Sequence, residues 1–172
     1  MATYPFGSGR PDPASFPNRE LGEAAMRVLP EMGNQLALYP GSLGYQPLRQ
    51  LMADRLLKRE GMAPAVDEIA LSNGSMQGVT LMAQMFIEKT GDGVIMEEFS
   101  YSGTIGAYKK EGAELIGIPV DEHGMRMDAL ADELKTRADK GNLPKFIYVL
   151  ATFQNPTGSV MPLERRKELL KI

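Results

Sequence analysis

Three short motifs of this sequence carry side chains that could bind a small ligand: Ser72–Gly78, Glu97–Gly103 and Gln154–Gly158. In the first motif, glycine permits a sharp turn before a helix, and the free N–H groups near Ser75 would attract an anion such as a phosphate. In the second, the ring of Tyr101 could stack on a flat ligand. In the third, Asn155 offers an amide donor, and Pro156 fixes the turn that carries it.

Each motif follows a short apolar run that is typical of a buried strand. Such runs lie at 69–71, 94–96, 115–120 and 146–150. Helical patterns lie near 21–29, 47–60, 75–89, 101–111, 128–140 and 162–172. This alternation predicts an α/β fold with a mostly parallel sheet that helices cover on both faces. Because ligands bind outside the carboxyl ends of parallel strands, we expect the three motifs to meet at one edge of the sheet.

The chain is predicted to have two parts. Residues 1–46 are rich in glycine and proline and read as an arm, whereas residues 47–172 carry the alternating pattern of a domain. Within the second part, Arg49 is expected to have a structural partner, and the adjacent Glu97 and Glu98 to be solvated or to cap a helix. The methionines of this part are interpreted as core residues: Met82, Met85 and Met96. We therefore assign no catalytic residue.

Composition excludes several classes of function. The formal charge is −3 and no basic block is present, which argues against nucleic acid as a partner. The chain has no cysteine, and its single histidine, His123, lies in a predicted turn, so no metal site is expected. The amino terminus lacks the pattern of a signal peptide, and no apolar run is long enough to span a membrane, so we expect a cytoplasmic protein.

The phosphate-binding patterns of common nucleotide sites are also missing. No G-x-G-x-x-G follows a predicted strand, and no G-x-x-x-x-G-K-[ST] is present, which argues against a dinucleotide or a nucleoside triphosphate. An anion site, a stacking ring and a fixed amide donor together would instead suit a planar phosphorylated cofactor with a polar ring substituent. Pyridoxal 5′-phosphate (PLP) has this chemistry.

Four motifs, in their order and spacing, resemble the class I/II aminotransferases of PLP fold type I: Tyr39–Arg49, Ser72–Gly78, Ser100–Gly103 and Gln154–Gly158. In addition, Gly9–Pro17 is similar to the amino-terminal arm of the branch that contains the 2-aminoadipate and kynurenine aminotransferases. The resemblance covers nearly the whole chain. It implies that the sheet is part of the large domain of that fold and is incomplete in these 172 residues.

The resemblance implies roles for three of the motif segments in binding PLP. The backbone N–H groups of Ser75 and Met76, with Gly74 shaping the turn, would hold the phosphate. Tyr101 would stack on the pyridine ring, and Asn155 would donate a hydrogen bond to the ring oxygen O3′.

The resemblance also implies contacts outside these motifs. Tyr39 would reach the phosphate of a neighbouring subunit, which implies a homodimer with shared sites. Gly9 and Arg10 would lie near the substrate.

The resemblance further implies that the chain is the amino-terminal part, under half, of an enzyme that transfers an amino group between an α-amino acid and a 2-oxo acid. Residues 1–46 would be the arm and a segment of the small domain, and residues 47–172 the start of the large domain. None of the nine lysines lies in the serine-rich setting of the family's Schiff-base lysine, so these residues alone are expected to be inactive and to leave sheet edges and apolar faces uncovered.

Two alternatives remain open from the sequence. Another PLP enzyme of fold type I, such as a lyase or a decarboxylase, uses the same phosphate and ring contacts. The PLP-sensing domain of a transcription regulator is also related to aminotransferases. The sequence does not identify which amino acid or 2-oxo acid the enzyme would use.

Overall fold

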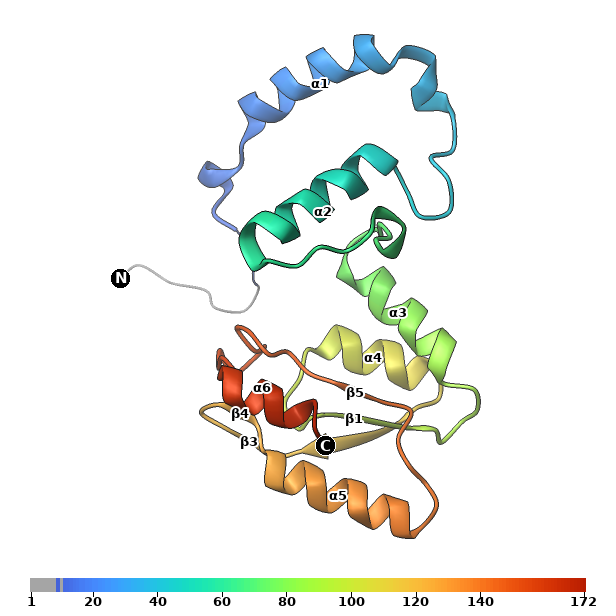
Figure 1. Ribbon diagram of the computed structural model, residues 1–172, viewed down its shortest axis with the longest axis vertical. Helices are drawn as coiled ribbons and strands as arrows, with labels where there is room; N and C mark the ends of the chain where they lie inside the picture. Colours follow the sequence, from blue (N-terminus) through green and yellow to red (C-terminus); the bar gives the residue numbers. More distant parts are fainter. Residues whose placement is uncertain (1–8, 10) are drawn as a thin grey trace, which may run out of the picture. The chain divides into compact units, whose positions relative to one another are not determined.

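The computed structural model describes Gly9 and residues 11–172, which divide into two compact units, one ending at Leu71 and one spanning Ser72–Ile172. Within its described residues, the first unit contains two α-helices and three short 3-10 helices (Figure 1): η1 (Pro13–Ser15), α1 (Asn18–Met32), η2 (Gly33–Ala37), α2 (Gln46–Glu60) and η3 (Val66–Glu68). The predicted boundary between the arm with its small-domain segment, residues 1–46, and the large domain, residues 47–172, stays a prediction.

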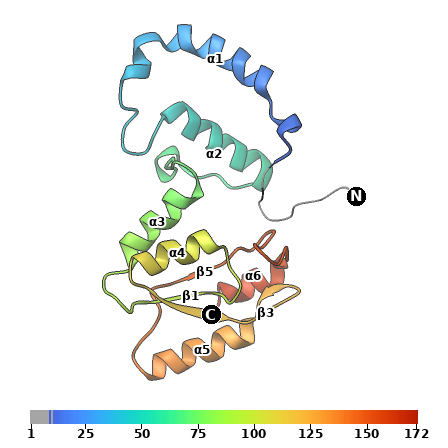
Figure 2. The same ribbon diagram turned by 180° about the vertical axis from the view of Figure 1, so that it is seen from behind.

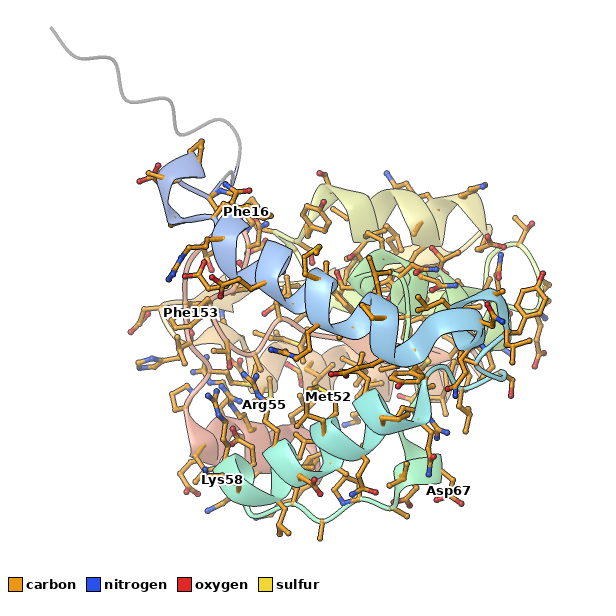
Figure 3. All side chains as sticks on the ribbon, turned by 90° about the horizontal axis from the view of Figure 1, so that it is seen from above. Phe16, Met52, Arg55, Lys58, Asp67 and Phe153 are labelled. Carbon is orange, nitrogen blue, oxygen red and sulfur yellow. The ribbon has the colours of Figure 1, made fainter. Side chains whose placement is uncertain are left out.

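Helix α2 forms where the sequence predicts a helix. Pro47 lies in its first turn, where a missing N–H has no effect on helical hydrogen bonding, and Gly61 ends it with φ of 69°. Figure 3 labels Met52, Arg55 and Lys58 along this helix, of which Met52 is partly buried and the two basic residues are exposed. The expected structural partner of Arg49 is confirmed, because its guanidinium donates to the carbonyl oxygens of Gly44 at 3.2 Å and of Val66 at 2.8 Å.

The second unit is a three-stranded parallel sheet in the order β2-β1-β5, with helices on both faces (Figure 2). The strands are β1 (Gly93–Glu97), β2 (Glu114–Ile118) and β5 (Phe146–Tyr148), and a separate antiparallel hairpin joins β3 (Val120–Asp121) to β4 (Gly124–Met125). The helices are α3 (Ser75–Phe86), α4 (Ser102–Lys110), α5 (Met127–Asp139) and α6 (Leu163–Leu169). The predicted α/β class with a parallel, helix-covered sheet is confirmed.

Alternation along the strands explains how the helices attach. Val94 of β1 joins a buried cluster with Ala83 of α3 and Tyr108 of α4, whereas the next residue, Ile95, joins a cluster with Leu130 of α5 on the other face. Successive side chains of a strand point to opposite faces, so a short continuous apolar run is buried on both. Helices α3 and α4 therefore cover one face of the sheet, and α5 and α6 cover the other.

Two details of the predicted fold are wrong. Residues 69–71 do not form a strand: Ile69 and Leu71 are partly buried, but the Leu71 N–H donates to the Leu43 carbonyl oxygen, outside any sheet ladder. Met96 is buried as predicted, whereas Met82 and Met85 of α3 are 45% and 67% exposed and fill no core. Among the described residues, no helix has the length and hydropathy that crossing a membrane requires.

Candidate functional site

Four of the predicted site residues line one pocket of the second unit. The pocket has a volume of about 230 Å³ and is lined by Ser75, Met76, Val79, Tyr101, Thr104, Tyr148, Leu150 and Asn155. These residues come from the start of α3, from the segments that follow β1 and β5, and from α4 and β5 themselves. Gly74 lies next to the lining as the N-cap of α3. The structure thus brings together the three motifs that the sequence singles out.

The start of α3 offers hydrogen-bond donors to this pocket. Gly74 has φ of 76°, a value that glycine adopts without strain, and it supplies no side chain to cap the helix. The turn is held instead by its neighbours, since Gln77 accepts from the Asn73 N–H at 2.5 Å and the Ser72 hydroxyl donates to the Gly74 carbonyl oxygen at 3.1 Å. N–H groups in the first turn of a helix have no partner within it, and the helix dipole makes them attractive to an anion.

The position of Tyr101 depends on a glycine. Tyr101 is the N-cap of α4, and a Cβ atom added to Gly103 would lie 2.5 Å from its Cε1 atom and 3.0 Å from its Cζ atom. Since real Cβ atoms do not approach other atoms this closely, the ring can occupy this place only because residue 103 has no side chain. Tyr101 itself remains partly open to solvent.

Two polar residues of the pocket, Thr104 and Tyr148, were not predicted. The Thr104 hydroxyl is buried and donates to the Tyr148 hydroxyl at 3.2 Å. The ring of Tyr148 packs edge-on against Tyr108, with centroids 5.7 Å apart. Burial, with the nearby Tyr148, raises the pKa of Tyr108 to about 12, so that phenol stays neutral. A signal did exist in the sequence, because Thr104 lies one helical turn after Tyr101 and Tyr148 lies two residues before Leu150 on the same side of the strand.

Asn155 lies in a loop that closes on itself. The Gln154 N–H donates to the Ser159 carbonyl oxygen at 2.9 Å, and the Gly158 N–H donates back to the Gln154 carbonyl oxygen at 2.5 Å. The peptide bond between Asn155 and Pro156 is cis. Within the described part of the chain, no hydrogen bond uses the Asn155 side chain, so its amide is available to a ligand in the pocket.

The interpretation of Glu97 as solvated or capping is wrong. Glu97 is 1% exposed, and its Oε2 atom accepts hydrogen bonds from the Leu150 N–H at 3.1 Å and from Gln154 Nε2 at 3.2 Å. Burial raises the pKa of the Glu97 carboxyl, and these two donors oppose the rise. Glu98 is exposed as expected, and its Oε1 accepts from the Val120 N–H at 3.0 Å.

The remaining predicted residues lie elsewhere or are not described. Tyr39 belongs to the first unit, where its side chain is fully exposed at the wall of a mostly apolar pocket of about 500 Å³. That pocket is larger, but the hydrogen-bond donors that the sequence predicts, at Ser75, Met76 and Asn155, line the smaller pocket. Gly9 is exposed, and Arg10 lies outside the described residues. His123 lies in the turn between β3 and β4, which confirms the predicted turn.

Other kinds of centre find no support in the described residues. No group of three or more histidine, aspartate or glutamate side chains gathers there in a way that could hold a metal ion. No lysine is among the residues that line the pocket of Asn155 in the same part of the chain. The pocket therefore offers groups that can bind a ligand: hydrogen-bond donors, the aromatic ring of Tyr101, and hydroxyl groups.

Comparisons with known proteins agree on one family. The family model "Aminotransferase class I and II" matches residues 5–172. The 2-aminoadipate transaminase of Thermus thermophilus is 36% identical over 167 residues, which cover 97% of this chain and 39% of that protein.

Solved structures give the same result. An archaeal alanine:glyoxylate aminotransferase superposes with a TM-score of 0.88 at 36% identity, covering 95% of this chain and 40% of that one. LysN, the α-aminoadipate aminotransferase of Thermus thermophilus, solved with N-(5′-phosphopyridoxyl)-L-leucine, superposes with a TM-score of 0.85 at 36% identity, covering 96% and 40%. The chain thus spans about 40% of the length of the relatives that it matches.

Proposed function

Because this chain belongs to the aminotransferase class I and II family, we propose that the whole protein is a PLP-dependent aminotransferase, which transfers an amino group between an α-amino acid and a 2-oxo acid. One observation carries the proposal: Ser75, Met76, Tyr101 and Asn155, which come from three separate motifs, line a single pocket. A phosphopyridoxyl ligand is bound in the related LysN structure, which supports PLP as the cofactor.

The residues of the pocket fit this cofactor in chemical type. The uncapped start of α3 suits the phosphate, because the N–H groups of Ser75 and Met76 and the helix dipole favour an anion there. The ring of Tyr101 suits a stacked pyridine. The Asn155 amide, which has no partner within the described part of the chain, suits the ring oxygen O3′.

In the reaction, PLP would supply an electron sink, and the residues of this chain would bind and orient it. Ser75 and Met76 would fix the phosphate, while Tyr101 would cover one face of the ring and exclude water from it. A donor on the ring oxygen stabilises negative charge there, so Asn155 would tune the proton affinity of the bound cofactor. The paired hydroxyls of Thr104 and Tyr148 would form a polar wall of the same pocket.

Substrates and assembly follow as parts of the same proposal. The substrate class is an α-amino acid with a 2-oxo acid, and Gly9 and Arg10 are proposed to lie near it. We also propose a cytoplasmic homodimer in which Tyr39 reaches the cofactor phosphate of the partner; its fully exposed side chain supports such a contact.

The test uses the protein at its full natural length. After addition of PLP, we expect a visible absorption band of the bound cofactor and conversion of 2-oxoglutarate to glutamate that depends on an added amino acid. Asn155→Ala should lower this rate by about tenfold, the effect of losing one hydrogen bond to a charged group. Release of carbon dioxide or ammonia without glutamate would instead indicate a decarboxylase or a lyase, and binding of PLP without turnover would indicate a sensor domain.

A further inference from the structure

Two buried side chains meet directly beneath the loop that carries Asn155. Glu97 is the last residue of β1, and Gln154 immediately precedes Asn155 in the chain. Their side chains are 1% and 2% exposed. Gln154 Nε2 donates to Glu97 Oε2 at 3.2 Å and to the Phe99 carbonyl oxygen at 2.6 Å, while Glu97 Oε2 also accepts from the Leu150 N–H. The amino side of the Gln154 amide is therefore tied to the end of β1.

The other end of the same amide holds the far side of the loop. Gln154 Oε1 accepts from the Thr157 N–H at 2.8 Å and from the Thr157 hydroxyl at 2.7 Å. The Gln154 side chain thus connects residue 154 to Thr157, and Asn155 and Pro156 lie between these two residues. The planar amide of Gln154 thus takes part in four hydrogen bonds whose directions are fixed. Rotation of this side chain would break all four together.

The backbone next to Gln154 is held in a conformation that the loop alone would not favour. Phe153 has φ of 51°, the left-handed region, which costs energy for a bulky residue other than glycine. Its side chain is mostly exposed and does not anchor it. Such conformations persist where the surrounding contacts determine the backbone. The chain after Phe153 is held by the Gln154 side chain, and the chain before it is held by Arg166, which donates to the Ala151 carbonyl oxygen and the Thr152 hydroxyl.

We propose that Glu97 and Gln154 are positioning residues for Asn155, which hold its loop so that the amide stays at the wall of the pocket. The inference rests on the proposed function, in which Asn155 donates to the ring oxygen of PLP. Neither Glu97 nor Gln154 lines the pocket, so both act through the loop and do not touch the ligand.

The test follows the visible absorbance of PLP bound to the full-length protein as a function of pH. Loss of a donor to the ring oxygen favours the form of the cofactor that keeps its proton, so Asn155→Ala should raise the pH at the midpoint of the absorbance change by about one unit. Gln154→Leu should raise the midpoint in the same direction. The double variant Asn155→Ala/Gln154→Leu should show no more than the shift of Asn155→Ala, because both remove the same interaction.

Conservative and mild variants keep the test interpretable where Gln154→Leu folds poorly. Glu97→Gln retains an acceptor for the Leu150 and Gln154 donors and should leave the midpoint at the wild-type value, whereas Glu97→Leu should behave like Gln154→Leu. Thr157→Val removes the hydroxyl that donates to Gln154 Oε1 and that also bonds the hydroxyl and the N–H of Ser159. It keeps the hydrogen bond from the Thr157 N–H to Gln154 Oε1 and should give a smaller rise of the same sign.

The matched control is at the other end of the same strand. Asp92 immediately precedes β1, is also buried, and accepts hydrogen bonds from the Glu88 and Lys89 N–H groups at 2.8 Å and 3.1 Å. Asp92→Leu should therefore lower the melting temperature as Glu97→Leu does, but it should leave the absorbance midpoint unchanged.

Two results would overturn the inference while leaving the proposed function intact. The first is a wild-type midpoint in both Gln154→Leu and Thr157→Val, and the second is full addition of the Gln154→Leu and Asn155→Ala shifts. A midpoint that Asn155→Ala itself does not move would also overturn it. Failure of the proposed function is distinguishable, because the wild-type protein would then show no transamination, with or without the absorbance of bound PLP.

Discussion

The ring of Tyr101 occupies space that only a glycine at position 103 leaves open, which gives a prediction at the scale of a single residue. Gly103→Ala would place a Cβ atom 2.5 Å from Tyr101 Cε1, and the partly exposed ring is the group that can move. We expect PLP to bind about tenfold more weakly, because displacement of the ring removes a stacking contact of about 1 kcal/mol or more. Titration of the full-length protein with PLP measures this.

The control for this substitution lies on the same helix. Gly106 is exposed, and a Cβ atom there would have no neighbour within 4 Å. Gly106→Ala should therefore stabilise α4 by about 0.5–1 kcal/mol and leave the affinity for PLP unchanged. Equal affinities for the Gly103→Ala and wild-type proteins would show that the ring does not need its present position.

At the scale of elements, the sequence predicts the helices well because their signals are local. Gly74 and Pro47 mark the beginnings of α3 and α2, and both helices start within one residue of the predicted position. Strands need a partner that local sequence does not reveal. Ile69–Leu71 has the same apolar character as a buried strand, yet no strand pairs with it, and the Arg49 guanidinium lies within 3.5 Å of the Ile69 carbonyl oxygen.

The same limit explains why the sequence alone does not reveal the buried contacts of Glu97. The short motifs of Ser75, Tyr101 and Asn155 can be read locally, and the structure brings them to one pocket. Glu97 cannot be read in this way, because its partners Leu150 and Gln154 lie 53 and 57 residues further along the chain. From the sequence alone, the adjacent carboxylates of Glu97 and Glu98 are expected to be solvated, and only the fold shows that Glu97 is buried.

The hairpin β3–β4, whose two-residue strands are too short to show a period, is joined to α6 by an ion pair that can be tested. Arg165 Nη1 and Nη2 donate to the two carboxylate oxygens of Asp121 at 2.5 Å and 3.0 Å, and both side chains are mostly buried. Arg165→Leu should lower the free energy of unfolding near neutral pH by about 1–2 kcal/mol, since a paired carboxylate loses both of its charge-assisted hydrogen bonds.

The part of this effect that depends on the charge of Asp121 should disappear in acid, whereas the part due to the Arg165 contacts with the Gly124 and Met125 carbonyl oxygens should remain. The hydrogen bonds from Arg165 lower the pKa of Asp121 below its ordinary value of 3.8, against the opposing effect of burial. The contribution of the pair is therefore fully present above 3.8 and is lost as the pH falls through the lower, folded-state pKa. Urea unfolding at several pH values measures it. Lys167→Ala, which breaks the exposed pair with Glu164 on the same helix, should cost less than about 0.5 kcal/mol, and an equal cost for both variants would contradict the prediction.

At the scale of the whole molecule, α3 carries apolar side chains that remain partly exposed, although the Phe86 ring packs against that of Phe146 with centroids 5.8 Å apart. Leu81, Met82, Met85 and Phe86 recur at the spacing of one helical face, and each is more than a third exposed. The strands β2 and β5 are also the two outer strands of the sheet. Both features promote association in water. Association buries the apolar area of the helix face, and it pairs the free N–H and C=O groups of the strand edges.

We therefore predict that the 172-residue chain, expressed by itself, associates as its concentration rises, and that Met85→Glu weakens this association. A charge at the centre of the apolar face must be desolvated when the face is covered, which opposes contact. Light scattering over a concentration series measures the effect, with Asn142→Glu as the control, since it adds the same charge at an exposed turn beyond α5. A monomeric chain at every concentration, with no response to Met85→Glu, would show that this face needs no cover.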